Sequence, residues 1–159
     1  MSKPGGHARH GRRDGIDPVL RSRARRRALQ AVYAWQIAGG FAKQVIAQFA
    51  HEQAHEVADL AYFESLVEGV LSNRSELDTA LTPYLDRGVE EVDAIERAVL
   101  RLAAYELLYR QDVPYRVVIN EAIETAKRFG SEHGHTYVNG VLDRAAVEGR
   151  KMESGASGA

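Results

Sequence analysis

Residues 91–110, EVDAIERAVLRLAAYELLYR, contain the longest apolar pattern in the chain. Its apolar residues recur at helical spacing and fall on one side of a helix: Ile95, Val99, Leu102, Ala103 and Leu107. Acidic residues cluster where this helix begins, and the helix dipole favours negative charge there. The stretch therefore predicts a central helix, and we interpret its carboxylates as structural rather than as an acid–base pair.

The same periodicity continues on both sides of this stretch, interrupted by short breakers. We expect six further helices: from about Arg23 to Ala38, from Phe41, after Asp59, near Ser75 to Leu81, from Pro114 to Gly130, and through Tyr137 to Leu142. No run alternates strictly between apolar and polar residues, as a half-buried strand would. The sequence thus predicts an all-α, single-domain bundle of about seven helices.

The two ends of the chain lack hydrophobic periodicity. Residues 1–20 are rich in Gly, Pro, His and Arg, and we expect them to form a flexible basic extension. Residues 151–159 (KMESGASGA) are expected to form a disordered tail. The predicted helical domain therefore covers residues 21–150.

Length and composition exclude several classes of protein. A chain of 159 residues is long enough to bury roughly 70% of its unfolded surface. It has no cysteine, which excludes disulfides and thiolate metal sites. No stretch approaches the roughly 20 apolar residues that span a bilayer, and no apolar segment follows the basic N-terminus as in a secretory signal. We therefore expect a cytoplasmic protein without membrane association.

Charge is distributed unevenly along the chain. Residues 1–27 hold nine Lys and Arg against two Asp, a balance of +7, whereas the other 132 residues hold 12 basic and 20 acidic side chains, a balance of −8. A basic arm on an acidic body is common among nucleic-acid-binding proteins, because the arm supplies phosphate contacts. A solvated charged tail is the alternative interpretation.

Residues 51–55, HEQAH, have the spacing of a zinc metalloprotease motif. His51 and His55 nevertheless fall opposite the apolar stripe of their own predicted helix, so they are expected to face water rather than a walled cleft. We predict no metal site there. His133 and His135, two apart around a glycine, also lack the companions of a metal site.

Residues 21–36, RSRARRRALQAVYAWQ, place five arginines at the N-terminal edge of a predicted helix. Arginine suits RNA because its planar guanidinium donates paired hydrogen bonds to phosphate and stacks on bases. The helix dipole disfavours cations at an N-terminus, so the clustering makes more sense with an anionic partner. The predicted RNA-binding residues are Arg21, Arg23, Arg25, Arg26, Arg27 and Tyr33; a solubilising basic edge remains the alternative.

Residues 131–143, SEHGHTYVNGVLD, predict a turn followed by the last helix. Tyr137 at the opening of that helix either stacks on an unpaired base or lies half-buried in the core. Single-stranded RNA is the favoured nucleic acid, because no recognition helix with groove-reading side chains is evident. The chain also lacks phosphate-binding loops, nucleophile motifs and dinucleotide fingerprints, so we expect neither catalysis nor a cofactor.

Three blocks of sequence together resemble the NusB family of transcription antitermination factors, in the form found in Gram-negative bacteria. They are RRRALQAVYAWQ (25–36), ERAVLRLAAYELLYRQDVPYRVVINEAIETAKRFG (96–130) and YVNGVLD (137–143), and the similarity covers roughly residues 21–147. The resemblance implies a small fold of two helical halves. It also implies binding to the boxA element of ribosomal RNA leader transcripts, together with the ribosomal protein NusE, in an antitermination complex with RNA polymerase.

The resemblance also assigns roles to particular residues. Arg21, Arg23 and Arg25 correspond to the family's RNA-contacting basic edge, and Tyr33 to a tyrosine at the RNA and partner surface. Glu96 corresponds to an acidic residue of that same functional face. Tyr137 stands where relatives often have Phe, His133 stands where relatives can carry Asp, and residues 1–20 extend beyond the arm of shorter relatives.

Two other functions remain open from the sequence. The chain could be the NusB-like RNA-binding domain of a ribosomal RNA methyltransferase, although no methyl-donor-binding α/β domain follows before Ala159. It could also be a purely protein-binding helical scaffold, whose function would survive deletion of the basic arm.

Overall fold

The computed structural model describes residues 16–52 and 59–158. The α-helices in these residues are α2 (Pro18–Ala38), α3 (Ala42–Glu52), α4 (Leu60–Ser72), α5 (Arg74–Leu81), α6 (Ala94–Tyr109), α7 (Tyr115–Phe129) and α8 (Gly134–Gly158). Two short 3-10 helices, η2 (Thr82–Tyr84) and η3 (Val89–Glu91), lie between α5 and α6. The described residues include no strand, so the predicted all-α fold of about seven helices is confirmed.

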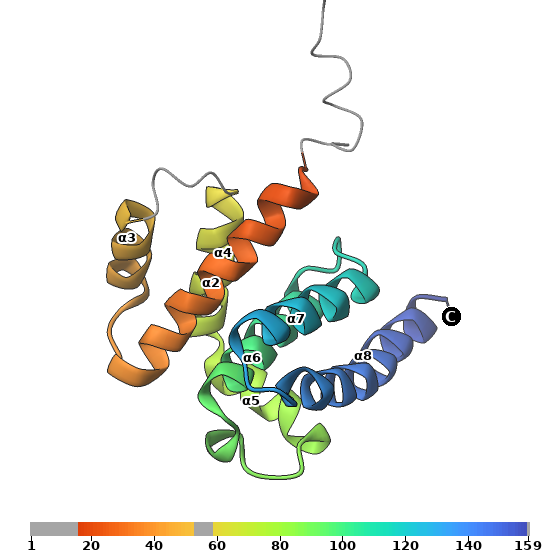
Figure 1. Cartoon of the computed structure of the whole chain (residues 1–159). Helices are drawn as coiled ribbons and strands as arrows, with labels where there is room; N and C mark the ends of the chain where they lie inside the picture. The colour runs from red at the N-terminus through yellow and green to blue at the C-terminus, as the bar shows by residue number, and fades with distance from the viewer. Residues whose placement is uncertain (1–15, 53–58, 159) are drawn as a thin grey trace, which may run out of the picture.

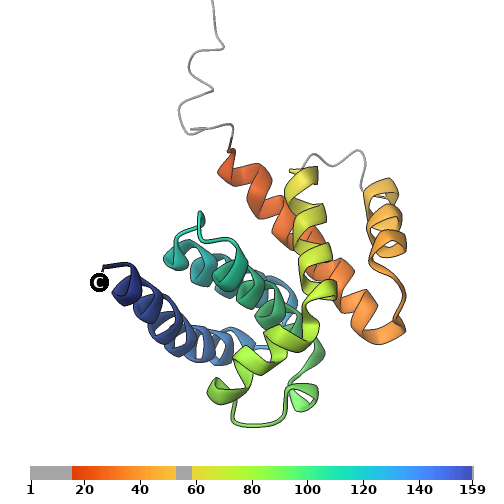
Figure 2. The same cartoon turned by 180° about the vertical axis from the view of Figure 1, so that it is seen from behind.

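The helices form two groups that meet along α6. Helices α2, α3 and α4 pack together, while α6, α7 and α8 form the second group with α5 beside α6 (Figure 1). The view from behind shows α4 crossing α2, against which it packs (Figure 2). Because α6 contacts α2, α4, α5, α7 and α8, the stretch with the longest apolar pattern is the centre of the bundle.

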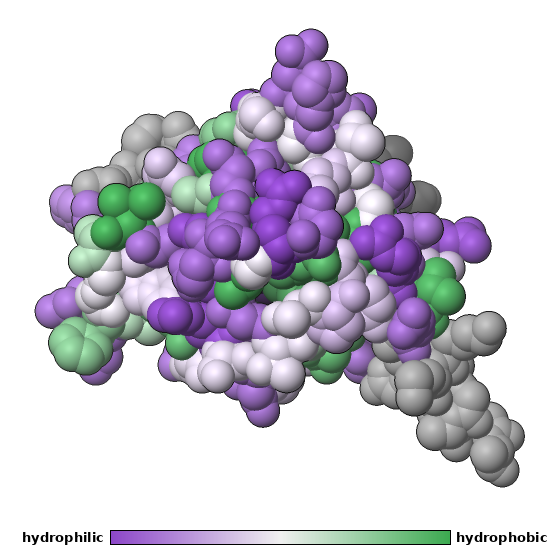
Figure 3. Space-filling view, turned by 90° about the horizontal axis from the view of Figure 1, so that it is seen from below, coloured by the Kyte–Doolittle hydropathy of each residue, from purple (hydrophilic) through white to green (hydrophobic). Residues whose placement is uncertain are grey.

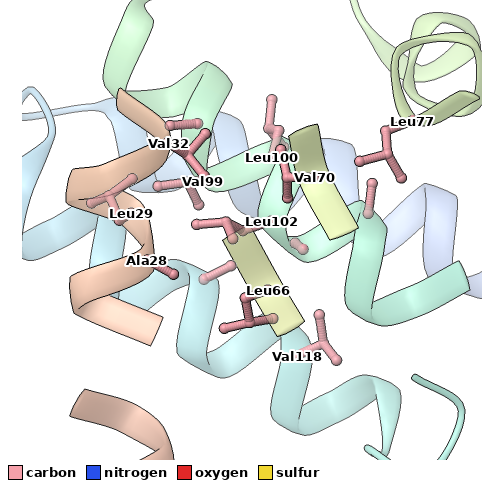
Figure 4. Packing of buried hydrophobic residues seen from close by; sticks show 14 of the residues in the cluster. Ala28, Leu29, Val32, Leu66, Val70, Leu77, Val99, Leu100, Leu102 and Val118 are labelled. Atoms are coloured by element: carbon pink, nitrogen blue, oxygen red, sulfur yellow. The ribbon is translucent and has the colours of Figure 1, made fainter. Parts of the chain in front are cut away.

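One continuous apolar core fills the space between these helices. Leu29 and Val32 of α2, Leu66 of α4, and Val99 and Leu100 of α6 are at most 2% exposed. Figure 4 shows these side chains converging from their separate helices. Burying an aliphatic side chain of this size contributes about 1.5–3 kcal/mol, so helix packing is the main source of stability.

Helix α2 begins earlier than the sequence analysis predicted, at Pro18 rather than near Arg23. The Asp17 side chain caps the helix by accepting from the backbone N–H of Val19 and Leu20 at 3.0 and 3.4 Å. Proline at the first helical position costs no hydrogen bond and has a helical φ. The five arginines consequently lie beyond the first turn, where the helix dipole has largely faded, so the argument from dipole repulsion does not apply.

Helix α8 also extends beyond its predicted end, because residues 151–158 continue it to Gly158. Extending an existing helix adds one hydrogen bond for each residue fixed, which is easier than starting a new helix. The structure thus has helix where the sequence analysis predicted a disordered tail. By contrast, Gly39 and Gly40 stop α2 with φ values of 77° and 114°, as their positions in the sequence predicted.

A buried arginine joins α2, α5, η3 and α6. Arg101 of α6 is 2% exposed, and its Nε and Nη2 donate to the two carboxylate oxygens of Asp78 at 2.9 Å each. Its Nη1 donates to Gln36 Oε1 at 2.9 Å, and Nη2 also donates to Glu90 Oε2 at 3.2 Å. One side chain therefore links four elements through charge-assisted hydrogen bonds.

The face seen from below is mostly polar. Seen from below, hydrophilic and intermediate residues cover much of the molecule, and hydrophobic residues form separate patches (Figure 3). None of the described helices combines the length and the apolar character that crossing a membrane requires.

Candidate nucleic-acid interface

The arginines of α2 divide between two faces of the helix. At 100° per residue, Arg21 and Arg25 fall on the side of the buried Leu29 and Val32. Arg23, Arg26 and Arg27 fall on the opposite side: Arg23 is exposed, while Arg26 and Arg27 are half-buried. Helical spacing in the sequence already separates Arg23, Arg26 and Arg27 from the side of Leu29 and Val32, although all five arginines were predicted to bind RNA.

Arg25 forms a buried ion pair with α6. It is 7% exposed, and its Nε and Nη2 donate to Glu106 at 2.8–3.1 Å. The Tyr62 hydroxyl donates to the same carboxylate. Burial opposes the charge of Arg25, but Glu106 outweighs it, so the pKa of Arg25 is raised. The Arg25 guanidinium therefore lies beside a carboxylate in the core, and its predicted contact with RNA stays a prediction.

Arg21 lies one turn before Arg25 and covers the ring of Tyr62. Its guanidinium carbon is 3.8 Å from the ring centroid, and its Nε is 3.6 Å from Asp59 Oδ2. Arg110 approaches the same ring at 4.8 Å. Such cation–π contacts fix the start of α2 against α4. Arg21 therefore helps to position α2, and its predicted contact with phosphate stays a prediction.

Arg23, Arg26 and Arg27 form the outer arginine face of α2. Burial lowers the pKa of Arg27, and the charges of Arg26 and Arg23 lower it further. Mutual repulsion of this kind shows three like charges held close together. Tyr33, 37% exposed, lies on the same side as Arg26 and adds an aromatic ring to the face. The face therefore offers cations for phosphates and a ring for stacking.

Glu96 lies inside the turn between α7 and α8. It is 5% exposed, and its Oε2 accepts from the backbone N–H and the hydroxyl of Ser131, each at 3.3 Å. A Cβ added at Gly134 would overlap this carboxylate, and one at Gly130 would lie 2.8 Å from it. Glu96 is thus buried and holds the turn that precedes Tyr137, and its predicted contact with a partner stays a prediction.

Replacing Glu96 with glutamine should change how stability depends on pH. Burial raises the pKa of Glu96, and Asp93 adds to the rise while the Ser131 hydrogen bonds oppose it. A raised pKa means that the folded protein holds this proton more tightly, so its stabilising contribution is lost as the pH rises above about 4.5. We expect the wild-type protein to lose free energy of unfolding relative to Glu96→Gln between pH 4 and pH 7, measured by urea unfolding. A difference between the two proteins that stays constant with pH would contradict this.

Tyr137, in the first turn of α8, is half-buried and contacts the loop before η3. Its hydroxyl donates to Asp86 Oδ1 at 3.2 Å, and the Arg87 guanidinium lies 5.2 Å from its ring centroid. Arg87 also donates to both carboxylate oxygens of Asp86, which is the main reason why the pKa of Asp86 falls to about 2.

The histidine motif lies partly outside the described residues. His51 is exposed near the end of α3, as predicted, whereas His55 is among the residues that the structure does not describe. His133 is exposed and His135 is half-buried. Within residues 16–52 and 59–158, no three His, Asp or Glu side chains gather as metal ligands.

The fold adds basic residues that the sequence analysis did not single out. Lys127 and Arg128 end α7, which packs against α2. Burial lowers the pKa of Arg26, and the charge of Arg128 lowers it further. A Lys-Arg pair in the last turn before a glycine is the usual pattern of a helix C-terminus. The sequence analysis therefore did not consider Lys127 and Arg128 as binding residues.

Fold and site together define a class: an all-helical protein with an arginine-rich outer face on its first described helix. Comparison with known proteins makes the class specific. The sequence profile of the NusB family matches residues 22–147. "Transcription antitermination protein NusB" from Xanthomonas campestris pv. campestris (strain B100) is 99% identical over 159 residues and all of both chains. The protein of that name from Xanthomonas axonopodis pv. citri (strain 306) is 96% identical over the same length.

Solved structures agree with this comparison. T. maritima NusB is 32% identical, with a TM-score of 0.72 over 80% of this chain and 90% of its own. A crystal structure of the antitermination factors NusB and NusE in complex with dsRNA shares the fold, with a TM-score of 0.74, 23% identity, and coverage of 80% and 96%. The chain belongs to the NusB family.

Proposed function

We propose that this chain is a non-catalytic transcription antitermination factor of the cytoplasm. It binds the boxA element of ribosomal RNA leader transcripts with NusE, in an antitermination complex with RNA polymerase. The observation that carries this proposal is the 99% identity over the full length of a transcription antitermination protein. Full-length identity also favours this function over a methyltransferase domain or a purely protein-binding scaffold.

The outer arginine face supports RNA as the ligand. Arg23, Arg26 and Arg27 lie within one turn of each other, with Tyr33 two turns along on the same side. Guanidinium groups bind phosphates bidentately, and a neighbouring ring stacks on a base. Tyr33 is accordingly proposed to contact RNA or NusE directly, whereas Glu96 acts indirectly by holding the α7–α8 turn.

A gel-shift assay with the full chain tests the proposal. We expect single-stranded boxA RNA to bind more tightly than a scrambled strand of equal length, and NusE to tighten boxA binding further. A duplex of the same sequence should bind less tightly, because its bases are unavailable for stacking. Equal affinity for boxA and scrambled strands, both with and without NusE, would reject the proposed function.

Tyr137→Ala should weaken boxA binding more than binding of the scrambled strand. Base–aromatic stacking is worth about 1–3 kcal/mol, which corresponds to about 5- to 150-fold in affinity. Tyr137→Phe is the matched control, because it keeps the ring and loses only the hydroxyl contact with Asp86. Fluorescence titration of labelled RNA measures both. If the Phe and Ala variants lose the same affinity, the ring has no stacking role.

A further inference from the structure

Asp86, Arg87 and Tyr137 form a compact group of side chains at the surface, which we call the Asp86 cluster. The Tyr137 hydroxyl donates to Asp86 Oδ1 at 3.2 Å, and the Arg87 guanidinium lies 5.2 Å from the ring centroid. Arg87 also donates through Nε and Nη2 to the two carboxylate oxygens of Asp86, at 2.8 and 3.0 Å. The Asp86 side chain is 62% exposed and that of Arg87 is 47% exposed, so a ligand can reach both.

The loop that carries Asp86 is anchored to the helix that carries the Tyr137 ring. The carbonyl of Tyr84, two residues before Asp86, accepts from Arg144 Nη2 at 2.7 Å. The Tyr84 hydroxyl donates to Glu148 Oε1 at 3.0 Å. Arg144, Glu148 and Tyr137 all belong to α8. These contacts hold the carboxylate beside the ring, independently of the Tyr137 hydroxyl.

The Arg87 side chain shows what kind of group the Asp86 cluster accepts. A guanidinium is planar, and two of its adjacent N–H groups donate in parallel to one carboxylate. In this position it also lies within cation–π distance of the Tyr137 ring. The donation from Arg87 is the main reason why the pKa of Asp86 is about 2, so the carboxylate is ionised at neutral pH and only accepts hydrogen bonds. The cluster therefore fits a flat group with a pair of adjacent donors.

Among the RNA bases, guanine alone has two adjacent donors on one edge. Its N1–H and 2-amino group lie side by side on the Watson–Crick edge. Adenine and cytosine have a donor beside an acceptor there, and uracil has one N–H between two carbonyl groups. Proteins read unpaired bases on this edge while stacking them on aromatic rings. The Arg87–Asp86 pair is exposed, and water screens such pairs, so a guanine can displace the guanidinium at little cost.

We propose that Asp86 and Tyr137 form a recognition site for one guanine of a single-stranded RNA. The base stacks on the Tyr137 ring and donates from N1–H and the 2-amino group to the two oxygens of Asp86. It takes the place of the Arg87 guanidinium, which is then free to bind a neighbouring phosphate. The inference rests on the proposed RNA-binding function and adds to it the identity of a base and the residue that reads it.

The test uses RNA strands that differ in one base. Each is a short uridine strand of fixed length with guanosine, inosine, 7-deazaguanosine or adenosine at its centre, and fluorescence titration measures its affinity for the full chain. We expect guanosine to bind about 5- to 150-fold more tightly than adenosine, the usual range for a paired contact to a base. Inosine lacks the 2-amino group and should lose most of this preference. Equal affinity for guanosine and inosine would overturn the site.

Asp86→Asn should abolish the preference for guanosine over inosine, because an amide has one acceptor and one donor group where the carboxylate has two acceptors. Asp143→Asn is the matched control. Asp143 is exposed on α8, about 9 Å from Tyr137 along the helix axis, and its replacement makes the same change of charge. The control should keep the preference. If both variants lose it, or if neither does, Asp86 does not read the base.

Arg87→Ala separates the role of the carboxylate from that of its neighbour. Arginine can itself read guanine, through O6 and N7 on the opposite edge of the base. If Asp86 reads the base, Arg87→Ala keeps the preference for guanosine over inosine, and 7-deazaguanosine, which lacks N7, binds as guanosine does. Weaker binding of 7-deazaguanosine that disappears in Arg87→Ala would assign the contact to Arg87 and overturn the role of Asp86.

Two further results separate this inference from the proposed function and from a structural role. If wild type prefers boxA to a scrambled strand but does not distinguish guanosine from inosine, the inference fails while the proposed function stands. If wild type binds none of these strands, both fail. Asp86→Asn should also keep the wild-type midpoint of thermal unfolding, because Asp86 is exposed. A lowered midpoint with an unchanged base preference would assign Asp86 to stability and overturn the site.

Discussion

Replacing Arg101 with alanine is expected to remove about 3–5 kcal/mol from the free energy of unfolding, the usual effect of breaking a buried ion pair. The side chain is 2% exposed, and its loss would leave the carboxylate of Asp78 and the amide of Gln36 without their shared donor. The total free energy of unfolding of a small domain is only about 5–15 kcal/mol. Urea unfolding monitored by circular dichroism should therefore show a much lower midpoint.

Arg74→Ala is the matched control, because Arg74 approaches the same two carboxylates from the solvent side. It lies 3.8 Å from both Asp78 and Glu90, and its side chain is 51% exposed. Exposed pairs contribute about 0–1 kcal/mol, since water solvates and screens the charges. Similar losses in the two variants would show that burial does not set the strength of the Arg101 contacts.

Replacing Arg23, Arg26 and Arg27 together with alanine should lower affinity for every RNA by on the order of a thousandfold. The estimate takes each charge-assisted contact as worth about tenfold. The log–log salt slope should fall in magnitude by about 2, because three fewer phosphates are neutralised. Sequence preference should persist, since phosphate contacts carry no information about the bases. Fluorescence titration of boxA and scrambled strands at several salt concentrations measures all three effects.

Lys43→Ala combined with Arg116→Ala is the control for this triple variant, because both residues are exposed and lie on α3 and α7 away from the arginine face. A comparable loss in the control would mean that total charge, rather than this face, governs binding. Arg25→Ala gives a second comparison. This change should destabilise the fold, because it removes the partner of the buried Glu106. The RNA affinity of the molecules that remain folded should not change.

Much of the fold follows from residues close together in sequence. The apolar spacing of α6, the glycines after α2 and the Asp59 cap of α4 act within one or two helical turns, and the structure has all three. The start of α2 was missed although its signal is equally local: Asp17 followed by Pro18 is a cap and a first helical residue. Its polar surroundings obscured it.

The candidate site was less predictable because it depends on pairs of residues far apart in sequence. Arg25 and its partner Glu106 are 81 residues apart, and Glu96 meets Ser131 across 35. Residue type marks such side chains as charged, but it does not say whether a counter-charge meets them in the core. Glu96, for example, was predicted to contact a partner. In the structure it is buried, because Ser131, which is 35 residues away in the sequence, meets its carboxylate inside the fold.

The sequence by itself determined the helical fold, the family and the presence of an arginine-rich segment, because helical periodicity and residue type are properties of neighbouring residues. Only the tertiary structure decided which arginines of that segment have partners within the fold. It pairs Arg25 with Glu106 and places Arg21 over Tyr62, whereas Arg23 lies exposed on the opposite side of α2. The physical reason is that a buried charge needs an opposite charge within a few ångströms. The packing of distant helices supplies that charge for Arg25.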